Sequence, residues 1–250
     1  MINILFFIES ISGGGAEKVL RNLVNAMDQT KFCITVQTLY PENVEKYLAP
    51  GIRYKHCYPV KNRINELRMR AEAAAGLTYP LHIKDDYDIE VAYLECGSTK
   101  IMASSTNQKA LKLAWVHCDL AKKADKPTAF ARETAKYYRK FDEVVCVSED
   151  VRRSFQEMYG SIAETAIVYN CYDDAEILHK AEKQVPAEEE RTVVAIGRLT
   201  AQKGFDRLLR VHKRLIDEGI RYQLKILGEG EDRKALEAFV EQNGLTDTVT

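Results

Sequence analysis

The chain has 250 residues, enough for one large or two small domains, and its 46% hydrophobic and 29% charged residues are ordinary for a globular protein. A formal net charge of −1 excludes the strong positive field of a typical nucleic-acid binder, so we expect no nucleic-acid partner. No apolar run reaches the ~20 residues that are needed to span a bilayer.

The first predicted unit is a buried strand at residues 2–8, a loop containing Gly13, Gly14 and Gly15, and an amphipathic helix. Apolar residues between Ala16 and Met27 recur at helical spacing and indicate the helix. The glycines do not match the G-x-G-x-x-G fingerprint, which ranks a NAD-dependent oxidoreductase lowest. Taken alone, they fit a tight turn without a ligand equally well.

Six widely separated cysteines show neither a C-x-x-C motif nor a nearby histidine. We therefore expect buried free thiols in a reducing cytoplasm, without disulfides and without a metal site.

The N-terminal run has no basic segment before it and is interrupted early by Glu9, which favours a first strand over a signal peptide. The expected location is cytoplasmic.

Further apolar runs continue the alternation of strands and helices and predict an α/β fold with a doubly wound parallel sheet. The expected strands lie at residues 32–39, 52–56, 89–94, 110–116, 143–147, 165–169, 192–196 and 222–227. Ligands of such sheets bind at the carboxyl ends of the strands, so polar residues at those ends are the candidates for a site.

Two stretches are basic. Residues 61–73 contain four Lys or Arg, and residues 109–140 contain nine Lys or Arg against three Asp or Glu, with Tyr137, Tyr138 and Phe141 among them. A basic face that carries aromatic side chains can rest on an anionic membrane surface, which here would be the inner face of the cell membrane. A solvated helix face explains the same charges, and both interpretations stay open.

Polar residues follow three of the predicted strands. Glu95 and Ser98 fit either a sugar hydroxyl or a helix cap. His117 ends an apolar strand and is followed by Asp119, which favours a functional histidine over a structural one. Ser148 is expected to cap a helix whose first turn contains Glu149 and Asp150, so these two carboxylates are not assigned to catalysis.

Residues 173–190 are acidic and contain Pro186, which predicts a linker and a domain boundary between residues 188 and 189. After it, a strand ends at Gly197, and a loop with Arg198 and Lys203 leads to a helix that opens at Gly204. Two cations beside a helix N-terminus suit a diphosphate, because each can add a charge-assisted hydrogen bond worth about 1.5–3 kcal/mol. Solvated loop charges are the alternative.

The last predicted strand leads to Gly228 and Gly230, which allow either a close approach to a ligand or a plain turn. His212 continues the apolar stripe of the preceding helix and is expected to be packed. The chain stops at Thr250, where a third strand of the second domain is expected to begin.

Five ordered segments resemble retaining glycosyltransferases of family 4, bacterial glycan- or capsule-type enzymes with the GT-B fold. The segments are Gly13–Leu20, Trp115–Asp119, Val147–Asp150, Asn170–Asp173 and Gly197–Gly204. The resemblance implies a GT-B-like protein with an acceptor-side domain at residues 1–188 and an incomplete nucleotide-sugar-binding domain at 189–250. A member of this family would continue for roughly another hundred residues, so we expect a truncated form of uncertain activity.

The resemblance also implies roles for individual residues. Arg198, Lys203, Gly14 and Gly15 would bind the donor diphosphate, and His117 would be the catalytic residue that meets the donor sugar. Gly228 and Gly230 would lie near the nucleotide, and the acceptor or sugar contacts would be Glu17, Glu95 and Asp119.

The predicted reaction moves a hexose-type sugar from a nucleoside diphosphate sugar to a glycan or lipid-linked acceptor. No cofactor and no metal are expected, since two fixed cations would neutralise the leaving diphosphate. A nucleotide-sugar epimerase of the same fold and a non-catalytic nucleotide- or glycan-binding module stay as alternatives.

Overall fold

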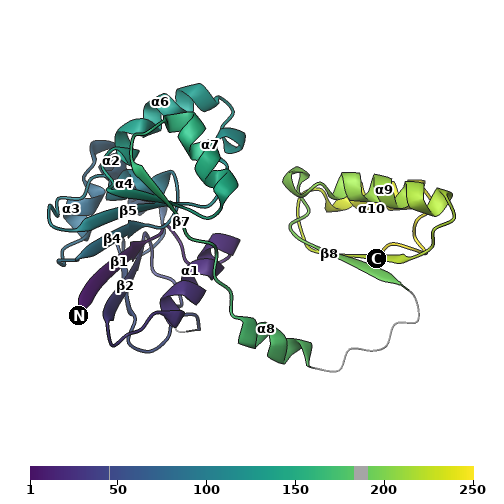
Figure 1. Ribbon diagram of the computed structural model, residues 1–250, viewed down its shortest axis with the longest axis horizontal. Helices are drawn as coiled ribbons and strands as arrows, with labels where there is room; N and C mark the ends of the chain where they lie inside the picture. The colour runs from purple at the N-terminus through teal and green to yellow at the C-terminus, as the bar shows by residue number, and fades with distance from the viewer. Residues whose placement is uncertain (45, 183–190) are drawn as a thin grey trace. The chain divides into compact units, whose positions relative to one another are not determined.

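The computed structural model describes residues 1–44, 46–182 and 191–250, which belong to two compact units (Figure 1). Unit 1 comprises Met1–Ala175 and unit 2 comprises Glu176–Thr250. The boundary expected between residues 188 and 189 lies outside the described residues, as does Pro186.

Unit 1 is built on a seven-stranded parallel sheet in the order β3-β2-β1-β4-β5-β6-β7. Its strands are β1 (Ile2–Phe7), β2 (Phe32–Thr38), β3 (Arg53–His56), β4 (Ile89–Ala92), β5 (Leu111–Val116), β6 (Glu143–Cys146) and β7 (Glu164–Ile167). The predicted doubly wound sheet is confirmed. Its strand order reverses between β1 and β4, and such a switch point is where open α/β sheets bind ligands.

The sheet is buried on both faces, as the continuous apolar strands predict. Along β1, Ile4 and Phe6 enter one core while Leu5 and Phe7 enter the other, because successive side chains of a strand point to opposite faces. One core includes Leu20 of helix α1. The other lies beneath several helices on the opposite face (Figure 1).

The helices of the first unit connect the strands, and a further helix, α8, crosses the division between the units. They are α1 (Gly15–Ala26), α2 (Arg63–Ala75), α3 (Thr78–His82), α4 (Gly97–Met102), α5 (Leu120–Lys123), α6 (Pro127–Tyr138), α7 (Glu149–Tyr159) and α8 (Asp174–Ala181). No helix in the described ranges is long and apolar enough to cross a bilayer.

The aromatic part of the basic segment 109–140 is placed differently from the prediction. Tyr138 is 2% exposed and Phe141 is 6% exposed, and both pack in the core with Phe155. Two of the three aromatic side chains named for this face therefore point inward, and Tyr137 alone stays half-buried, with Lys136 Nζ 5.0 Å from its ring centre. The six cysteines are free, as predicted, but only Cys57 and Cys146 are buried and Cys96 is exposed.

Unit 2 contains a parallel pair of strands, β8 (Thr192–Ile196) and β9 (Gln223–Leu227), with the short 3-10 helix η1 (Ala201–Lys203), α9 (Phe205–Asp217) and α10 (Arg233–Gln242). A bridge between Leu224 and Val249 begins where the third strand is expected. His212 is fully buried, lies 2.9 Å from the hydroxyl of Thr248 through Nε2 and packs against the Tyr222 ring, as a packing residue should.

Candidate functional site

The glycine loop follows β1 at the switch point of the sheet. Gly14 is the N-cap of α1 and Gly15 is its first residue, while Gly13 has a φ of +108° that favours glycine. A Cβ on Gly14 would lie 2.0 Å from a carboxylate oxygen of Glu17, so this carboxylate folds back over the start of the helix. An incoming diphosphate at Gly14 and Gly15 therefore requires the Glu17 side chain to move.

A second carboxylate, from the loop that follows the neighbouring parallel strand β2, fixes the glycine loop at the same edge of the sheet. Glu42 accepts hydrogen bonds from the backbone amides of Ile11 at 2.9 Å and Ser12 at 3.0 Å, and from the hydroxyl of Ser10. The sequence analysis did not single out Glu42, since a partner thirty residues away leaves no local pattern. Its role here is to hold the chain between β1 and α1 in one conformation.

Glu95 lies at the carboxyl end of β4 and ties it to β5. One carboxylate oxygen accepts from Lys123 Nζ and Cys118 Sγ, each at 3.0 Å, and the other accepts from the His117 backbone amide at 3.2 Å. Burial raises the Glu95 pKa, but these hydrogen bonds and the Lys123 charge outweigh it and leave the pKa below the ordinary value. Both oxygens are occupied, so the structure gives Glu95 the role of positioning the His117 segment.

The His117 ring lies among aromatic side chains. Its centroid is 4.7 Å from the Tyr93 ring and 6.4 Å from the Trp115 ring, to which it is nearly parallel. Burial lowers the His117 pKa, with the nearby Glu95 charge offsetting part of the effect, so the imidazole is neutral at pH 7. A neutral imidazole offers one donor and one acceptor.

Several polar groups around His117 lack a hydrogen-bond partner. Within the described residues these are both ring nitrogens of His117, the Trp115 Nε1 and the Tyr93 hydroxyl. An unsatisfied buried polar group costs about 1–3 kcal/mol, so it is a feature that a polar ligand or ordered water would relieve. The sequence pointed to His117 and Trp115 but missed Tyr93, which is hidden in an apolar strand end.

Asp119 has a local structural role. Its carboxylate caps α5 by accepting from the Ala121 and Lys122 amides, and it also accepts from the Ser154 hydroxyl at 2.5 Å. The hydrogen bond from Ser154 is the main cause that lowers the Asp119 pKa. These contacts account for the carboxylate without a ligand. A sugar contact by Asp119 stays a prediction.

The loop between β8 and α9 and the first turn of α9 contain three cationic side chains. Lys203 lies beside Gly197, since a Cβ placed on Gly197 would be 3.7 Å from Lys203 Cδ. The Arg207 guanidinium lies over Gly204, where an added Cβ would be 2.8 Å from Nη2. Arg198, Lys203 and Arg207 are exposed, and in the described part of the chain none of the three forms an ion pair.

Gly204 has a φ of +69° and precedes α9, so the predicted strand, loop and helix start are confirmed. Unpaired cations beside a helix N-terminus form an arrangement that attracts a phosphate. The sequence analysis missed Arg207, although its place in the first turn after the glycine was a usable sign.

Gly228 and Gly230 are required by packing within unit 2. A Cβ on Gly228 would lie 1.8 Å from the Gly197 carbonyl oxygen, and one on Gly230 would lie 2.2 Å from the Leu199 carbonyl oxygen. The Leu199 amide donates to the Glu229 carbonyl at 2.9 Å across the same contact. The two loops at the carboxyl ends of β8 and β9 therefore support each other, and nucleotide binding by these glycines stays a prediction.

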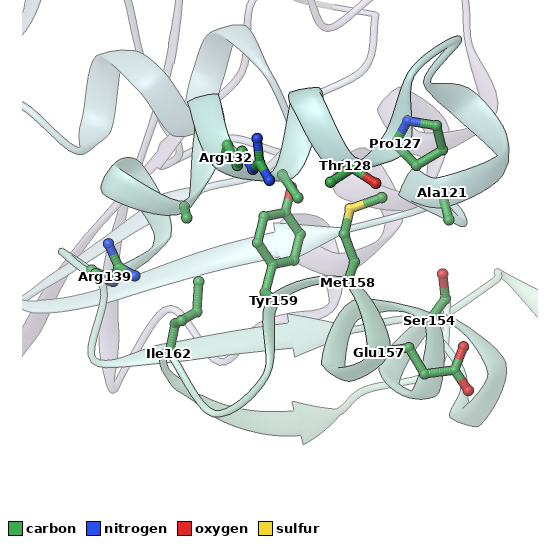
Figure 2. A pocket seen from close by; sticks show the side chains of 12 residues that line it. Ala121, Pro127, Thr128, Arg132, Arg139, Ser154, Glu157, Met158, Tyr159 and Ile162 are labelled. Carbon is green, nitrogen blue, oxygen red and sulfur yellow. The ribbon is translucent and has the colours of Figure 1, made fainter.

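A pocket of about 660 Å³ lies between α5, α6 and α7, and none of the predicted site residues lines it (Figure 2). A polar pocket of about 480 Å³ lies at the carboxyl end of β1 and is lined by Glu9, Ser10, Ser12, Tyr40, Glu42, Lys61 and Arg70, among others. This pocket lies at the ligand-binding edge of the sheet of unit 1, and a further pocket of about 520 Å³ at the carboxyl end of β9 is lined by Leu199, Gly228 and Glu229, among others. In the described ranges no three His, Cys, Asp or Glu side chains cluster as metal ligands.

Solved structures share this architecture. HepE of Anabaena superposes with a TM-score of 0.69 at 16% identity, covering 100% of this chain and 68% of HepE. A variant of S. aureus TarM gives a TM-score of 0.72 at 11% identity, covering 100% of this chain and 77% of TarM. The chain has the fold of the GT-B glycosyltransferases. The expectation of a GT-B-like α/β fold is confirmed.

Sequence comparisons agree with this fold. The family model described as "Glycosyl transferases group 1" matches residues 177–250. An uncharacterized glycosyltransferase of Haemophilus influenzae is 24% identical over 268 residues, covering 100% of this chain and 68% of the relative. The family model thus matches the second unit alone, and the relative that aligns with the whole chain carries a glycosyltransferase name.

Proposed function

We propose that this protein is a retaining glycosyltransferase that moves a hexose-type sugar from a nucleoside diphosphate sugar to a glycan or lipid-linked acceptor. The observation that carries the proposal is the loop and first turn that open α9, where Lys203 lies beside Gly197, Arg207 lies beside Gly204 and Arg198 is exposed, none of them in an ion pair within the described part of the chain. HepE has been crystallised with UDP and glucose and with UDP-glucose, and the TarM structure contains UDP. UDP is therefore the first donor nucleotide to test.

The cations would act on the leaving group. Breaking the bond between sugar and diphosphate concentrates negative charge on the phosphate oxygens, and fixed positive groups stabilise that charge without reorganisation. Arg198 and Lys203 would bind the diphosphate, with Arg207 as a third positive group. In this proposal no bound metal is needed to neutralise the diphosphate.

Unit 1 would orient the sugar. Neutral His117 would exchange hydrogen bonds with a sugar hydroxyl, and Tyr93 and Trp115 have polar atoms that need partners in the same place. Glu95 would hold the His117 backbone in position. The Gly14–Gly15 backbone would approach the donor phosphates. The acceptor would be a membrane-associated glycan, reached from the cytoplasmic side.

Calorimetric titration with UDP tests the proposal. Because each charge-assisted hydrogen bond is worth about 1.5–3 kcal/mol, the double change Arg198→Ala, Lys203→Ala should weaken UDP binding by at least about 100-fold. The matched control is Lys213→Ala, Arg214→Ala, which removes two cations paired with Asp217 and Glu218 farther along the same helix. Equal affinities for the site variant and the control would refute the assignment.

Product analysis tests the finer claims. Incubation with UDP-sugars and candidate acceptors, followed by NMR of the product, should show an anomeric carbon with the configuration of the donor. Formation of an epimerised sugar nucleotide without acceptor would identify an epimerase instead.

A further inference from the structure

The exposed face of α2 has an apolar stripe that no part of the described chain covers. Ile64 is 77% exposed and Leu67 is 59% exposed, and the exposed Ala71 continues the stripe at helical spacing. In a surface helix, residues at this spacing usually face the core. Here Ile64 and Leu67 are exposed instead, on a helix that lies among those covering one face of the unit 1 sheet (Figure 1).

The orientation of α2 is fixed by its opposite face. Buried Glu72 accepts from the Tyr58 hydroxyl at 2.7 Å and from Arg68 Nε at 2.6 Å, and His82 Nε2 lies 2.8 Å from the carboxylate. Met69 packs against the core beside it. Rotating α2 to hide Ile64 and Leu67 would break these buried hydrogen bonds, which is strongly unfavourable.

The ends of the helix are equally well defined. Asn62 caps the N-terminus by accepting from the Asn65 amide at 2.8 Å, and Gly76 ends the helix in the left-handed conformation with φ of 70°. The exposed stripe is therefore part of a complete, capped helix whose rotation is set by the fold.

Cations border the stripe on both sides. Arg63 and Arg70 are seven residues apart and lie along one side, Arg68 lies along the other, and Lys61 precedes the helix. The two carboxylates of α2 point elsewhere, because Glu72 is buried and the half-buried Glu66 lines the polar pocket at β1. The exposed face is aliphatic in the middle, basic at its edges and free of acidic side chains.

We propose that this face of α2 docks the protein on an anionic lipid bilayer, and the proposal refines the membrane partner given under Proposed function. Ile64 and Leu67 enter the boundary between headgroups and acyl chains, and Arg63 and Arg70 bind lipid phosphates. Aliphatic residues flanked by cations are the pattern of interfacial helices, and guanidinium groups bind phosphate in a bidentate manner. A protein interface would more often present aromatic side chains at its centre, and this face has none.

The polar pocket at the end of β1 lies next to the proposed docking face of α2. Lys61 and Arg70 belong both to this basic border and to the pocket of about 480 Å³ that contains Glu9 and Ser10 at the end of β1. A lipid-linked acceptor held at the bilayer would therefore have its polar end beside the ligand-binding edge of the sheet. This last step rests on the proposed function, whereas the docking itself does not.

Helix α6 of the other basic segment lacks the apolar component. No large apolar side chain of α6 is exposed, since Tyr138 is buried and Phe130 and Tyr137 are half-buried. Arg132 and Arg139 of α6 line the pocket between α6 and α7 (Figure 2). The two segments looked alike in the sequence, and the structure distinguishes them by what each exposes.

Vesicle co-sedimentation of the 250-residue chain tests the proposal, with phosphatidylcholine vesicles that contain or lack phosphatidylglycerol. The charge variant is Arg63→Ser, Arg70→Ser, and the apolar variant is Ile64→Ser, Leu67→Ser. The matched control is Arg132→Ser, Arg139→Ser on α6, which removes the same charge. At about 1 kcal/mol for each basic residue near an anionic surface, the charge variant should bind anionic vesicles about 30-fold more weakly.

The expected result is binding of wild-type protein to anionic vesicles only, loss in both α2 variants and retention in the α6 control. The proposal would be overturned if the wild-type protein did not bind anionic vesicles, or if the α6 control lost as much vesicle binding as the α2 variants. So would a dimer in solution that the Ile64→Ser, Leu67→Ser change dissociates, since a second copy would then be the occupant.

UDP titration of the same samples separates this test from that of the proposed function. Vesicle binding without UDP affinity supports docking and contradicts the assignment of the β8–α9 loop. UDP affinity without vesicle binding supports the assignment of the β8–α9 loop and contradicts docking. The α2 variants should keep the wild-type far-UV circular dichroism, because every substituted side chain is exposed.

Discussion

Gly15 is a position at which a substitution can affect ligand binding without affecting the stability of the fold. A Cβ at this position would meet nothing within 4 Å, and its φ is not in the left-handed region. Gly15→Ala at the first position of α1 should therefore leave stability unchanged or raise it by about 0.4–1 kcal/mol. If the Gly15 backbone approaches the donor phosphates, the added methyl group should weaken UDP-sugar binding about tenfold.

Thermal unfolding and calorimetry with UDP-glucose measure the two effects on the same samples. The control is Gly219→Ala, which should lower stability because Gly219 has a φ of +84°. Unchanged UDP-sugar affinity in Gly15→Ala would leave the glycine with a role in the turn alone.

Individual residues could be predicted from the sequence where the relevant partner lies nearby in the chain. Ser148 accepts from the Val151 amide at 3.2 Å and caps α7, as expected, because an N-cap depends on the next three residues. Glu42 and Tyr93 were missed because the amides that Glu42 binds and the rings that Tyr93 contacts come from distant parts of the chain. Asp119 was assigned a possible sugar contact, and the structure adds a local role that the sequence did not show, because Oδ1 also accepts from Ser154 of a distant helix.

At the scale of one element, Asp119 tests how α5 is held. Asp119→Ala removes the N-cap and the contact with Ser154, so unfolding free energy should fall by about 1–2 kcal/mol at pH 7. The pKa of this carboxyl is lowered in the folded protein. Its contribution is thus complete above the ordinary Asp pKa of about 4 and is lost as pH falls through the folded value.

Urea unfolding of wild type, Asp119→Ala and the control Asp125→Ala at pH 7 and pH 3 checks both statements. The control removes an exposed carboxylate of the same region for which the structure shows no hydrogen bond. A difference between wild type and Asp119→Ala that is as large at pH 3 as at pH 7 would contradict the electrostatic cap.

The positions of the strands were easier to predict than which face of each helix is buried. Strands buried on both faces are continuous apolar runs, and β1 and β5 stood out for that reason. A helix that mixes apolar and charged residues has two candidate inner faces, and only tertiary packing selects one. In α2 the buried face is the one that contains Glu72, whose carboxylate has three partners. Local sequence rules would place a charged residue such as Glu72 on the exposed face.

At the scale of the whole molecule, the two units differ greatly in core size. Unit 1 has two extensive cores, one on each face of its sheet. The buried side chains described in unit 2 are only Leu199, Phe205, Leu209, His212, Leu224 and Leu245. Val193, Val194 and Ile196 of β8 are exposed by 45%, 53% and 77%. Small cores give low stability, since a 60-residue domain buries only about 60% of its unfolded surface.

We therefore expect two unfolding transitions in urea, with unit 2 unfolding first. Trp115 is the one tryptophan of the chain and lies in a core of unit 1, so its fluorescence should report the later transition alone. Far-UV circular dichroism should report both, and probes that do not coincide are evidence against a two-state process. Tyr222→Trp places a second reporter against His212 in unit 2 and should add an early fluorescence change.

Adding UDP to the same unfolding experiment tests which unit binds the nucleotide. A ligand that binds only the folded form shifts the transition of the unit that holds it, by about 2.7 kcal/mol at a hundred times its Kd. With the diphosphate bound by Arg198 and Lys203, UDP should move the early transition to higher urea and leave the late Trp115 transition in place. Coincident transitions in all probes would show that the two units unfold as one. A UDP-dependent shift confined to the late transition would place the nucleotide in unit 1, against the cation group at α9.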